Sequence, residues 1–205
     1  MKIIEKSLIL GMIFSVLYNI VNFSVSCENI NSKIFRLHIL ANSASVEDQS
    51  LKMRIKDKIQ KFSKNILNNH NNKEESEDIF IKNLSNVEKI AKNEIRKCGY
   101  NYPVSARVTN SYFNTRNYEN FTLPAGNYDA LEIKIGSGKG KNWWCVIFPM
   151  LCVGASSKNK NLDKTFNKNE KNIICNRKKK YAIKFRVVEI YQLVKKWICS
   201  KIYKL

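Results

Sequence analysis

The sequence predicts an α+β domain in which a mainly antiparallel sheet is covered by two amphipathic helices, with a further helix at the C-terminus. Three observations predict this fold class. Residues 34–40 alternate as a strand does, and two longer segments then repeat apolar residues at helical spacing. Alternation returns in the later half of the chain, between glycine-containing turns. Two helices in series beside several strands favour a helical layer packed on a sheet.

The N-terminus of the 205-residue chain has the composition of an export signal. Lys2 and Lys6 form a basic start, and an apolar run follows over residues 7–20. Ser24-Val25-Ser26 then offers small residues at the positions that a signal peptidase reads. The pattern predicts a signal peptide over residues 1–26.

A retained membrane anchor over residues 7–23 is the alternative, and a lipid-modified Cys27 is a third reading of the same segment. The uninterrupted apolar run is shorter than the roughly 20 residues that span a bilayer, which favours cleavage. Ser24 stands where a lipidation signal usually carries leucine, which disfavours a lipoprotein. All three alternatives predict that the rest of the chain is exported.

The formal net charge of +19 suggests a partner that is anionic, such as nucleic acid or a membrane. Lysine, asparagine and isoleucine are all over-used, and their AT-rich codons offer a compositional explanation for the charge. Attraction to an anionic membrane follows under either explanation. Because exported proteins rarely meet DNA and the aromatic residues are not interleaved with basic ones, we expect no nucleic acid partner. A basic exported module that binds an anionic polymer, nucleic acid or a membrane surface remains the alternative function.

The first strand and the helix after it are predicted from periodicity. Over residues 34–40 the apolar side chains fall on one face, with Arg36 and His38 on the other. Ser45, followed by Asp48, resembles a capping box, so a helix is expected over residues 46–67. Its apolar stripe is Leu51, Ile55, Ile59, Phe62 and Ile66.

A second helix is predicted over residues 75–98, where Gly99 is placed to end it. Strands are then predicted over residues 104–109, 128–135 and 143–148. The last of these is apolar on both faces, which is typical of a central or covered strand.

Three regions complete the predicted organisation. Residues 27–155 form the domain, and residues 156–180, rich in lysine and asparagine, are expected to be a flexible linker. Residues 181–205 are predicted to contain an amphipathic helix that either packs back on the domain or lies on a membrane.

Motifs that would indicate an enzyme are weak. The run Gly136 to Lys141 lacks the spacing of a phosphate-binding loop and is predicted to be a hairpin turn. His38 and His70 are too isolated for a metal site, and Cys145 with His38 is a thin case for a nucleophile and its base. We therefore expect no catalytic residue, metal, cofactor or small-molecule substrate.

Two cysteines lie close in the sequence, Cys145 and Cys152. Export permits a disulfide between them, and two buried apolar thiols are the alternative.

Three segments carry a pattern of specific residues. The first is Phe35-Arg36-Leu37-His38-Ile39-Leu40-Ala41-Asn42-Ser43, continuing through Ser45 to Asp48-Gln49; the second is Leu123-Pro124-Ala125-Gly126-Asn127-Tyr128-Asp129-Ala130-Leu131. The third is Gly138-Lys139-Gly140 with Asn142-Trp143-Trp144-Cys145-Val146-Ile147-Phe148-Pro149 and Leu151-Cys152. Together these segments resemble the stage II sporulation protein R family. Ala44 and Met150 depart from the pattern, where the family usually carries an acidic residue and a proline.

The resemblance implies a relay between two cells. Proteins of this family are made in the forespore and exported across its membrane into the intermembrane space. There they activate a membrane-embedded aspartic protease of the mother cell, which cuts the pro-sequence from sigma-E. The segments that carry the resemblance predict the surface that contacts the protease. The predicted partner-binding residues are Arg36, Asn42, Ser43, Asp48, Gln49, Pro124, Gly126, Trp143, Trp144 and Pro149.

Overall fold

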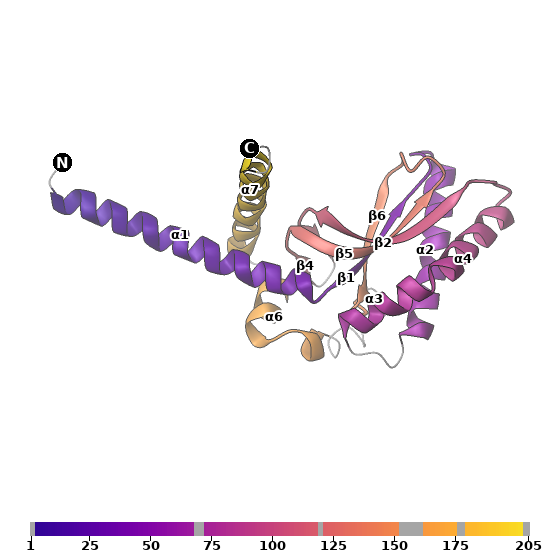
Figure 1. The fold of residues 1–205 in the computed structure, drawn as a ribbon, viewed down its shortest axis with the longest axis horizontal. Helices are drawn as coiled ribbons and strands as arrows, with labels where there is room; N and C mark the ends of the chain where they lie inside the picture. Colours follow the sequence, from indigo (N-terminus) through magenta and orange to yellow (C-terminus); the bar gives the residue numbers. More distant parts are fainter. Residues whose placement is uncertain (1–2, 68–71, 119–120, 152–161, 176–178, 203–205) are drawn as a thin grey trace. The chain divides into compact units, whose positions relative to one another are not determined.

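The computed structural model describes residues 3–67, 72–118, 121–151, 162–175 and 179–202, drawn in Figure 1. The chain divides into two compact units. The first comprises residues 1–32, 112–127 and 166–205, and the second comprises residues 33–111 and 128–165.

The second unit is built on a four-stranded sheet whose strands are ordered β2-β5-β1-β6. The strands are β1 (Phe35–Leu40), β2 (Val104–Phe113), β5 (Gly126–Ile135) and β6 (Asn142–Phe148). Strand β1 runs parallel to β5 and antiparallel to β6. The predicted α+β class is confirmed, and the sheet is mixed.

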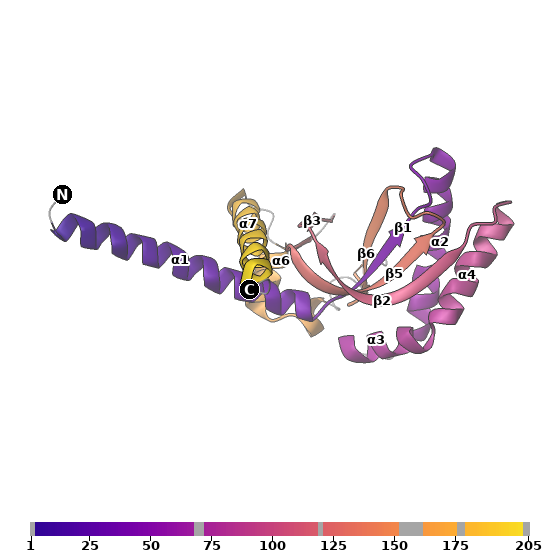
Figure 2. The ribbon, with the colours of Figure 1, turned by 45° about the horizontal axis from the view of Figure 1, so that its top comes forward.

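Three helices cover one face of this sheet: α2 (Val46–Ile66), α3 (Lys73–Lys82) and α4 (Leu84–Lys97). Helices α2 and α4 run side by side along it, as Figures 1 and 2 show. Apolar side chains of the helices and of the inner face of the sheet form the core. Its fully buried members include Phe35, Leu37, Ile39, Ile55, Ile59, Phe80, Val87, Ala91, Leu131 and Ile133.

The single helix predicted over residues 75–98 is wrong, because the chain breaks at Asn83. The Asn83 amide donates to the Phe80 carbonyl at 3.1 Å, which tightens the last turn of α3, and Val87 then donates to Asn83 at 3.0 Å. The apolar stripe continues across the break, since both helices face the same core. Periodicity alone therefore did not reveal it.

One prediction about the last strands is corrected. Strand β1 lies between β5 and β6, so residues 136–141 cannot form a hairpin turn and instead cross the end of β1.

The strand predicted to be central or covered is a covered one. Strand β6 is at the edge of the described sheet, and its apolar residues Cys145 to Phe148 are buried, which explains the continuous apolar pattern.

The first unit contains helix α1 (Ile3–Ser32), the short strands β3 (Arg116–Asn117) and β4 (Thr122–Leu123), and helices α6 (Lys168–Cys175) and α7 (Lys179–Ile202). Helix α1 is long and apolar enough to cross a membrane, with a mean hydropathy of 1.9 over 18 residues that are 6% buried. This character fits a signal peptide or a membrane anchor.

Helix α6 lies within the segment that was expected to be a flexible linker. The Asn167 and Glu170 side chains each accept a hydrogen bond from the other residue's backbone amide, at 2.9 Å in both cases. This reciprocal cap starts a helix in a sequence whose composition alone suggests a coil.

Candidate functional site

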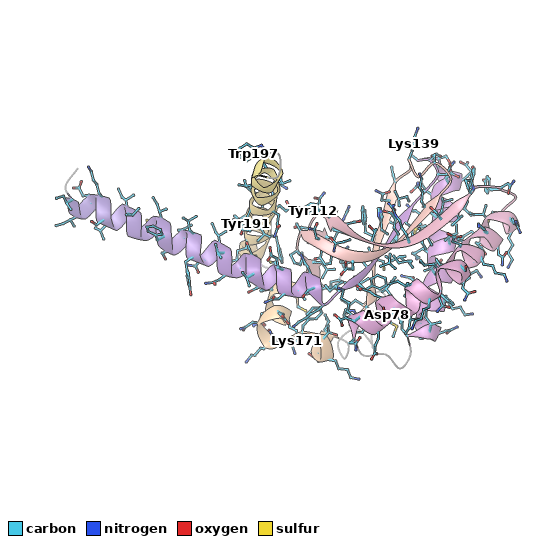
Figure 3. All side chains as sticks on the ribbon, viewed as in Figure 1. Asp78, Tyr112, Lys139, Lys171, Tyr191 and Trp197 are labelled. Carbon is cyan, nitrogen blue, oxygen red and sulfur yellow. The ribbon has the colours of Figure 1, made fainter. Side chains whose placement is uncertain are left out.

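The chain leaving β1 and the loop between β5 and β6 meet at one end of the sheet. The Gly140 amide donates to the Ala41 carbonyl at 2.9 Å, and the Lys139 amide donates to the Asn42 carbonyl at 3.3 Å. Figure 3 labels Lys139 in this loop. We call this region the sheet-end cluster; it consists of Asn42, Ser43, Asp48, Gln49 and residues 136–141.

Asn42 connects the loop to helix α2. Its side-chain oxygen accepts from the Ser137 amide at 3.0 Å, and its side-chain nitrogen donates to Asp48 Oδ2 at 2.9 Å. The Ser137 hydroxyl also donates to the Asn42 carbonyl. One short amide side chain therefore joins the end of β1, the first turn of α2 and a loop 95 residues further along the chain.

Two glycines make the close approach possible. A Cβ atom at Gly136, whose φ is +56°, would lie 2.2 Å from Asn42 Oδ1. A Cβ atom at Gly140 would lie 2.1 Å from the Ser43 carbonyl oxygen. The glycines that suggested a turn are thus required by contact with the end of β1.

The first turn of α2 supplies the rest of the cluster. The Ser45 hydroxyl accepts from the Asp48 amide at 3.2 Å, which confirms the predicted cap. Gln49 donates to the Ser43 carbonyl at 2.8 Å. Lys52 Nζ donates to Gln49 Oε1 at 2.6 Å and to the Lys141 carbonyl at 2.9 Å.

Lys52 belongs to this network and is only 4% exposed, but it was not among the site residues predicted from the sequence. Burial lowers the pKa of its ammonium group, and the nearby charge of Lys141 lowers it further. In the sequence, a lysine next to Leu51 at the edge of an apolar stripe is expected to lie in solvent. Nothing in the sequence therefore indicates that Lys52 bonds Gln49 and the Lys141 carbonyl.

Asp48 is the buried acid of the cluster. Burial by itself raises the pKa of its carboxyl group, but hydrogen bonds from Ser43, Asn42 and Tyr102 outweigh burial and hold that pKa below its ordinary value. The group is therefore a carboxylate at neutral pH, and its charge stabilises the donors around it.

Replacing Asp48 by Asn is expected to lower the free energy of unfolding by about 1–3 kcal/mol at neutral pH, because the donors lose a charged acceptor. A lowered folded-state pKa adds stability above pH 3.8, the ordinary pKa of the carboxyl group, and that stability is lost as pH falls through the folded-state value. The difference between the two proteins should therefore shrink below about pH 4. Denaturant unfolding across pH measures it.

The matched control is Asp57→Asn, on the same helix, because the Asp57 side chain is 67% exposed. That change should have little effect at any pH. An Asp48→Asn difference that stays constant between pH 7 and pH 3 would contradict the assignment of a buried carboxylate.

The two predicted tryptophans of β6 point to opposite faces of the sheet. Trp143 packs with the core, where the Lys56 ammonium lies 5.2 Å from the centre of its ring. Trp144 stacks on His38 across the strand pair, with ring centroids 3.8 Å apart and planes within 9°. Both tryptophans are half-buried.

The same alternation separates Cys145 from His38. Cys145 pairs with Leu37 on the core face of the sheet, whereas His38 lies on the other face beside Trp144. Burial is the main cause that lowers the pKa of His38, although Glu132, at 3.4 Å, opposes the shift. The pleat therefore rules out Cys145 and His38 as a nucleophile and its base.

The remaining predicted residues do not join the cluster. Arg36 is fully buried, with its guanidinium 4.8 Å from the centre of the Tyr128 ring, so it is not available as a direct contact. Pro124 and Gly126 belong to the other unit, where a Cβ atom at Gly126 would meet the Asn31 side chain at 2.1 Å. Pro149 is buried after a cis peptide bond.

The predicted disulfide cannot be placed, because Cys152 lies outside the described residues. Cys145 is disulfide-bonded, but its pairing with Cys152 stays a prediction. Among the described residues no group of three or more histidine, cysteine, aspartate or glutamate side chains could hold a metal ion.

Comparison with known proteins places this architecture in a family. The model of the family described as stage II sporulation protein R matches residues 31–159, which include the sheet, helices α2 to α4 and the sheet-end cluster. Stage II sporulation protein R of Bacillus subtilis (strain 168) is 39% identical over 123 residues, covering 60% of this chain and 55% of that protein. The chain thus spans about half the length of the curated relative that it matches. No solved structure matches. The chain belongs to the stage II sporulation protein R family.

Proposed function

We propose that this protein is an exported signalling protein of sporulation. It crosses the forespore membrane into the intermembrane space and activates a membrane-embedded aspartic protease, which then removes the pro-sequence of sigma-E in the mother cell. Membership of the family supports the role in sporulation. The long apolar helix α1 is compatible with export, either as a signal peptide or as an anchor.

The observation that carries the proposal is the rigid surface around the sheet-end cluster, within the matched residues. Three chain segments are fixed there by hydrogen bonds through Asn42 and by glycines that tolerate no side chain. A surface that is already ordered loses little conformational entropy on binding. The cluster is therefore suited to contact a partner protein.

Exposed side chains beside the cluster supply the contacts. Val46, the first residue of α2, is an apolar residue that is 81% exposed. Ser137 and Lys139 are exposed on the loop, and Trp144 lies half-buried in the adjoining edge strand. An apolar group, a half-buried tryptophan and a polar rim are the usual components of a protein interface.

The proposed role needs no chemistry from this chain, since an aspartic protease activates the attacking water with its own pair of carboxyl groups. Co-expression of the full chain with the candidate protease and its pro-sigma substrate in a non-sporulating host tests it directly. We expect processed sigma factor when all three are present and none when this chain is omitted. Processing that proceeds equally without this chain, or fails with it, would reject the proposed activation.

The same assay tests the contact surface. We expect Val46→Asp and Trp144→Ala to lower processing by at least about ten-fold, as the loss of central interface residues usually does. The matched control is Ile81→Asp, because Ile81 is also an exposed apolar residue of a helix, at 52% exposure, and lies outside the cluster. As a check on folding, each variant must be secreted in the same amount as the native chain and must resist an added digestive protease to the same degree. Full processing by both folded variants would show that the contact surface lies elsewhere.

A further inference from the structure

Helix α7 exposes a row of large apolar side chains. Ile190 is 56% exposed and Trp197 is 62% exposed, and Ile183, Leu193 and Val194 are similar. Positions 190, 194 and 197 recur at helical spacing, so these three lie along one face of the helix, and the exposed Arg186 separates them from Ile183. Figure 3 labels Trp197 near the far end of α7. A soluble domain seldom leaves such a row uncovered.

The first half of α7 packs against α1. The rings of Phe23 and Phe185 lie 5.8 Å apart, and Lys184 Nζ lies 5.1 Å from the centre of the Phe23 ring. Further along, Gln192 donates to Glu28 at 3.1 Å. An apolar cleft of about 410 Å³ lies between the two helices; its lining includes Val16, Ile20, Phe23, Ile183, Val187 and Val188.

These contacts occur where the apolar run of α1 ends. The 17 residues from Ser7 to Phe23 carry no charged side chain and would reach about 26 Å as a helix, close to the roughly 30 Å of a bilayer core. Beyond them, Cys27, Ile30 and Asn31 are buried, and the Asn31 side chain donates to the Ala125 carbonyl at 3.4 Å. Helix α1 thus changes from an exposed apolar rod to a part of the folded unit at the level of α7.

The direction of α7 suits a membrane surface. Figures 1 and 2 both show α7 crossing α1 steeply instead of running along it. If α1 stands across a bilayer, a helix that crosses it steeply near its C-terminal end lies along the plane of the membrane. Residues 177–180, immediately before and at the start of α7, are all basic, and Lys195 and Lys196 follow within it. Basic residues with an apolar stripe and a tryptophan are typical of helices in the interface of an anionic membrane.

We propose that α1 and α7 form one membrane-attachment unit, in which α1 spans an anionic phospholipid bilayer and α7 lies in its interface with the exposed apolar row toward the lipid chains. The bilayer is favoured over a second copy of the chain because α7 packs against α1, and α1 is itself long and apolar enough to cross a membrane. The net charge of +19 adds attraction to anionic headgroups. The proposal does not depend on protease activation. It requires that α1 is retained, since Phe23 precedes the candidate cleavage site.

Quenching of tryptophan fluorescence by brominated lipid tests the depth of Trp197. The full chain and its Trp197→Phe variant are reconstituted in vesicles of phosphatidylglycerol and phosphatidylethanolamine, with and without bromine on the acyl chains. The difference between the fluorescence intensities of the two proteins is the emission of Trp197, because Trp143 and Trp144 contribute equally to both. We expect the Trp197 signal to fall by about two-fold or more in the brominated vesicles, as for an indole in the interface.

The double variant Ile190→Glu, Val194→Glu should abolish this quenching, because two charges on the apolar row oppose insertion. The matched control Ile81→Glu changes an equally exposed isoleucine in the other unit and should leave the quenching unchanged. Vesicles of neutral phosphatidylcholine should reduce it. An unquenched Trp197, quenching that survives the double variant, or a chain recovered from cell membranes that begins at Cys27 would each overturn the proposal.

Discussion

Gly140→Ala is expected to lower the free energy of unfolding by about 2–4 kcal/mol, among the largest effects of any single methyl group in this chain. The new Cβ atom would lie 2.1 Å from the Ser43 carbonyl oxygen and 2.9 Å from the Ala41 Cβ atom. The first of these is backbone at the end of a central strand, so the loop itself must move. Denaturant unfolding of the full chain in detergent micelles, followed by tryptophan fluorescence, measures the change.

Gly99→Ala is the matched control for this prediction. Gly99 has a φ of +81°, but a Cβ atom there would meet nothing within 4 Å. Its replacement should therefore carry only the backbone strain of a left-handed residue, about 1–2 kcal/mol. If Gly140→Ala is no more destabilising than Gly99→Ala, the loop is free to move and the sheet-end cluster is less rigid than its contacts indicate.

Phe80→Ala should lower the free energy of unfolding by about 3–5 kcal/mol, because a fully buried ring is replaced by a cavity. The ring joins α3 to the sheet and to α2: its centroid lies 5.8 Å from that of Phe35 and 6.3 Å from that of Phe62. The position is one turn before the break at Asn83, whose amide donates to the Phe80 carbonyl.

The neighbouring residue provides the comparison. Ile81 is 52% exposed on the same helix, and Ile81→Ala should change the stability by no more than about 0.5 kcal/mol. The same unfolding measurement is used for both. Similar losses for the two variants would mean that α3 does not pack on the sheet as described.

Periodicity predicted these elements well because each one turns a regular apolar face to a shared core. The stripe of Leu51, Ile55 and Ile59 and the alternation of Phe35, Leu37 and Ile39 meet in the same core. Strand direction and order leave no such mark, since an alternating strand has the same pattern whether its neighbour is parallel or antiparallel. For this reason the position of β1 between β5 and β6, and with it the true path of the glycine loop, came only from the structure.

The candidate site was partly predicted. Asn42, Ser43, Asp48 and Gln49 were predicted from the family resemblance, and the structure brings them together through hydrogen bonds. The segment of Pro124 and Gly126 was equally prominent in the sequence but belongs to the other unit, where Gly126 gives room to Asn31. Resemblance marks residues that a family needs, and it does not separate contact residues from those that shape the backbone.

The placement of β1 also bears on when the chain can fold. Its six residues pair with Asp129 to Lys134 on one side and with Asn142 to Phe148 on the other, about ninety residues or more further along the chain. Contacts between residues so far apart in the sequence form late, because closing the long loop costs conformational entropy before the contacts add any stability. A chain threaded through a membrane from its N-terminus would therefore hold β1 without its first partner strand until residues near 134 had emerged, and without its second until residues near 148 had emerged. If the chain is exported as proposed, this topology would keep the sheet of the domain incomplete, and so competent for translocation, for most of the passage.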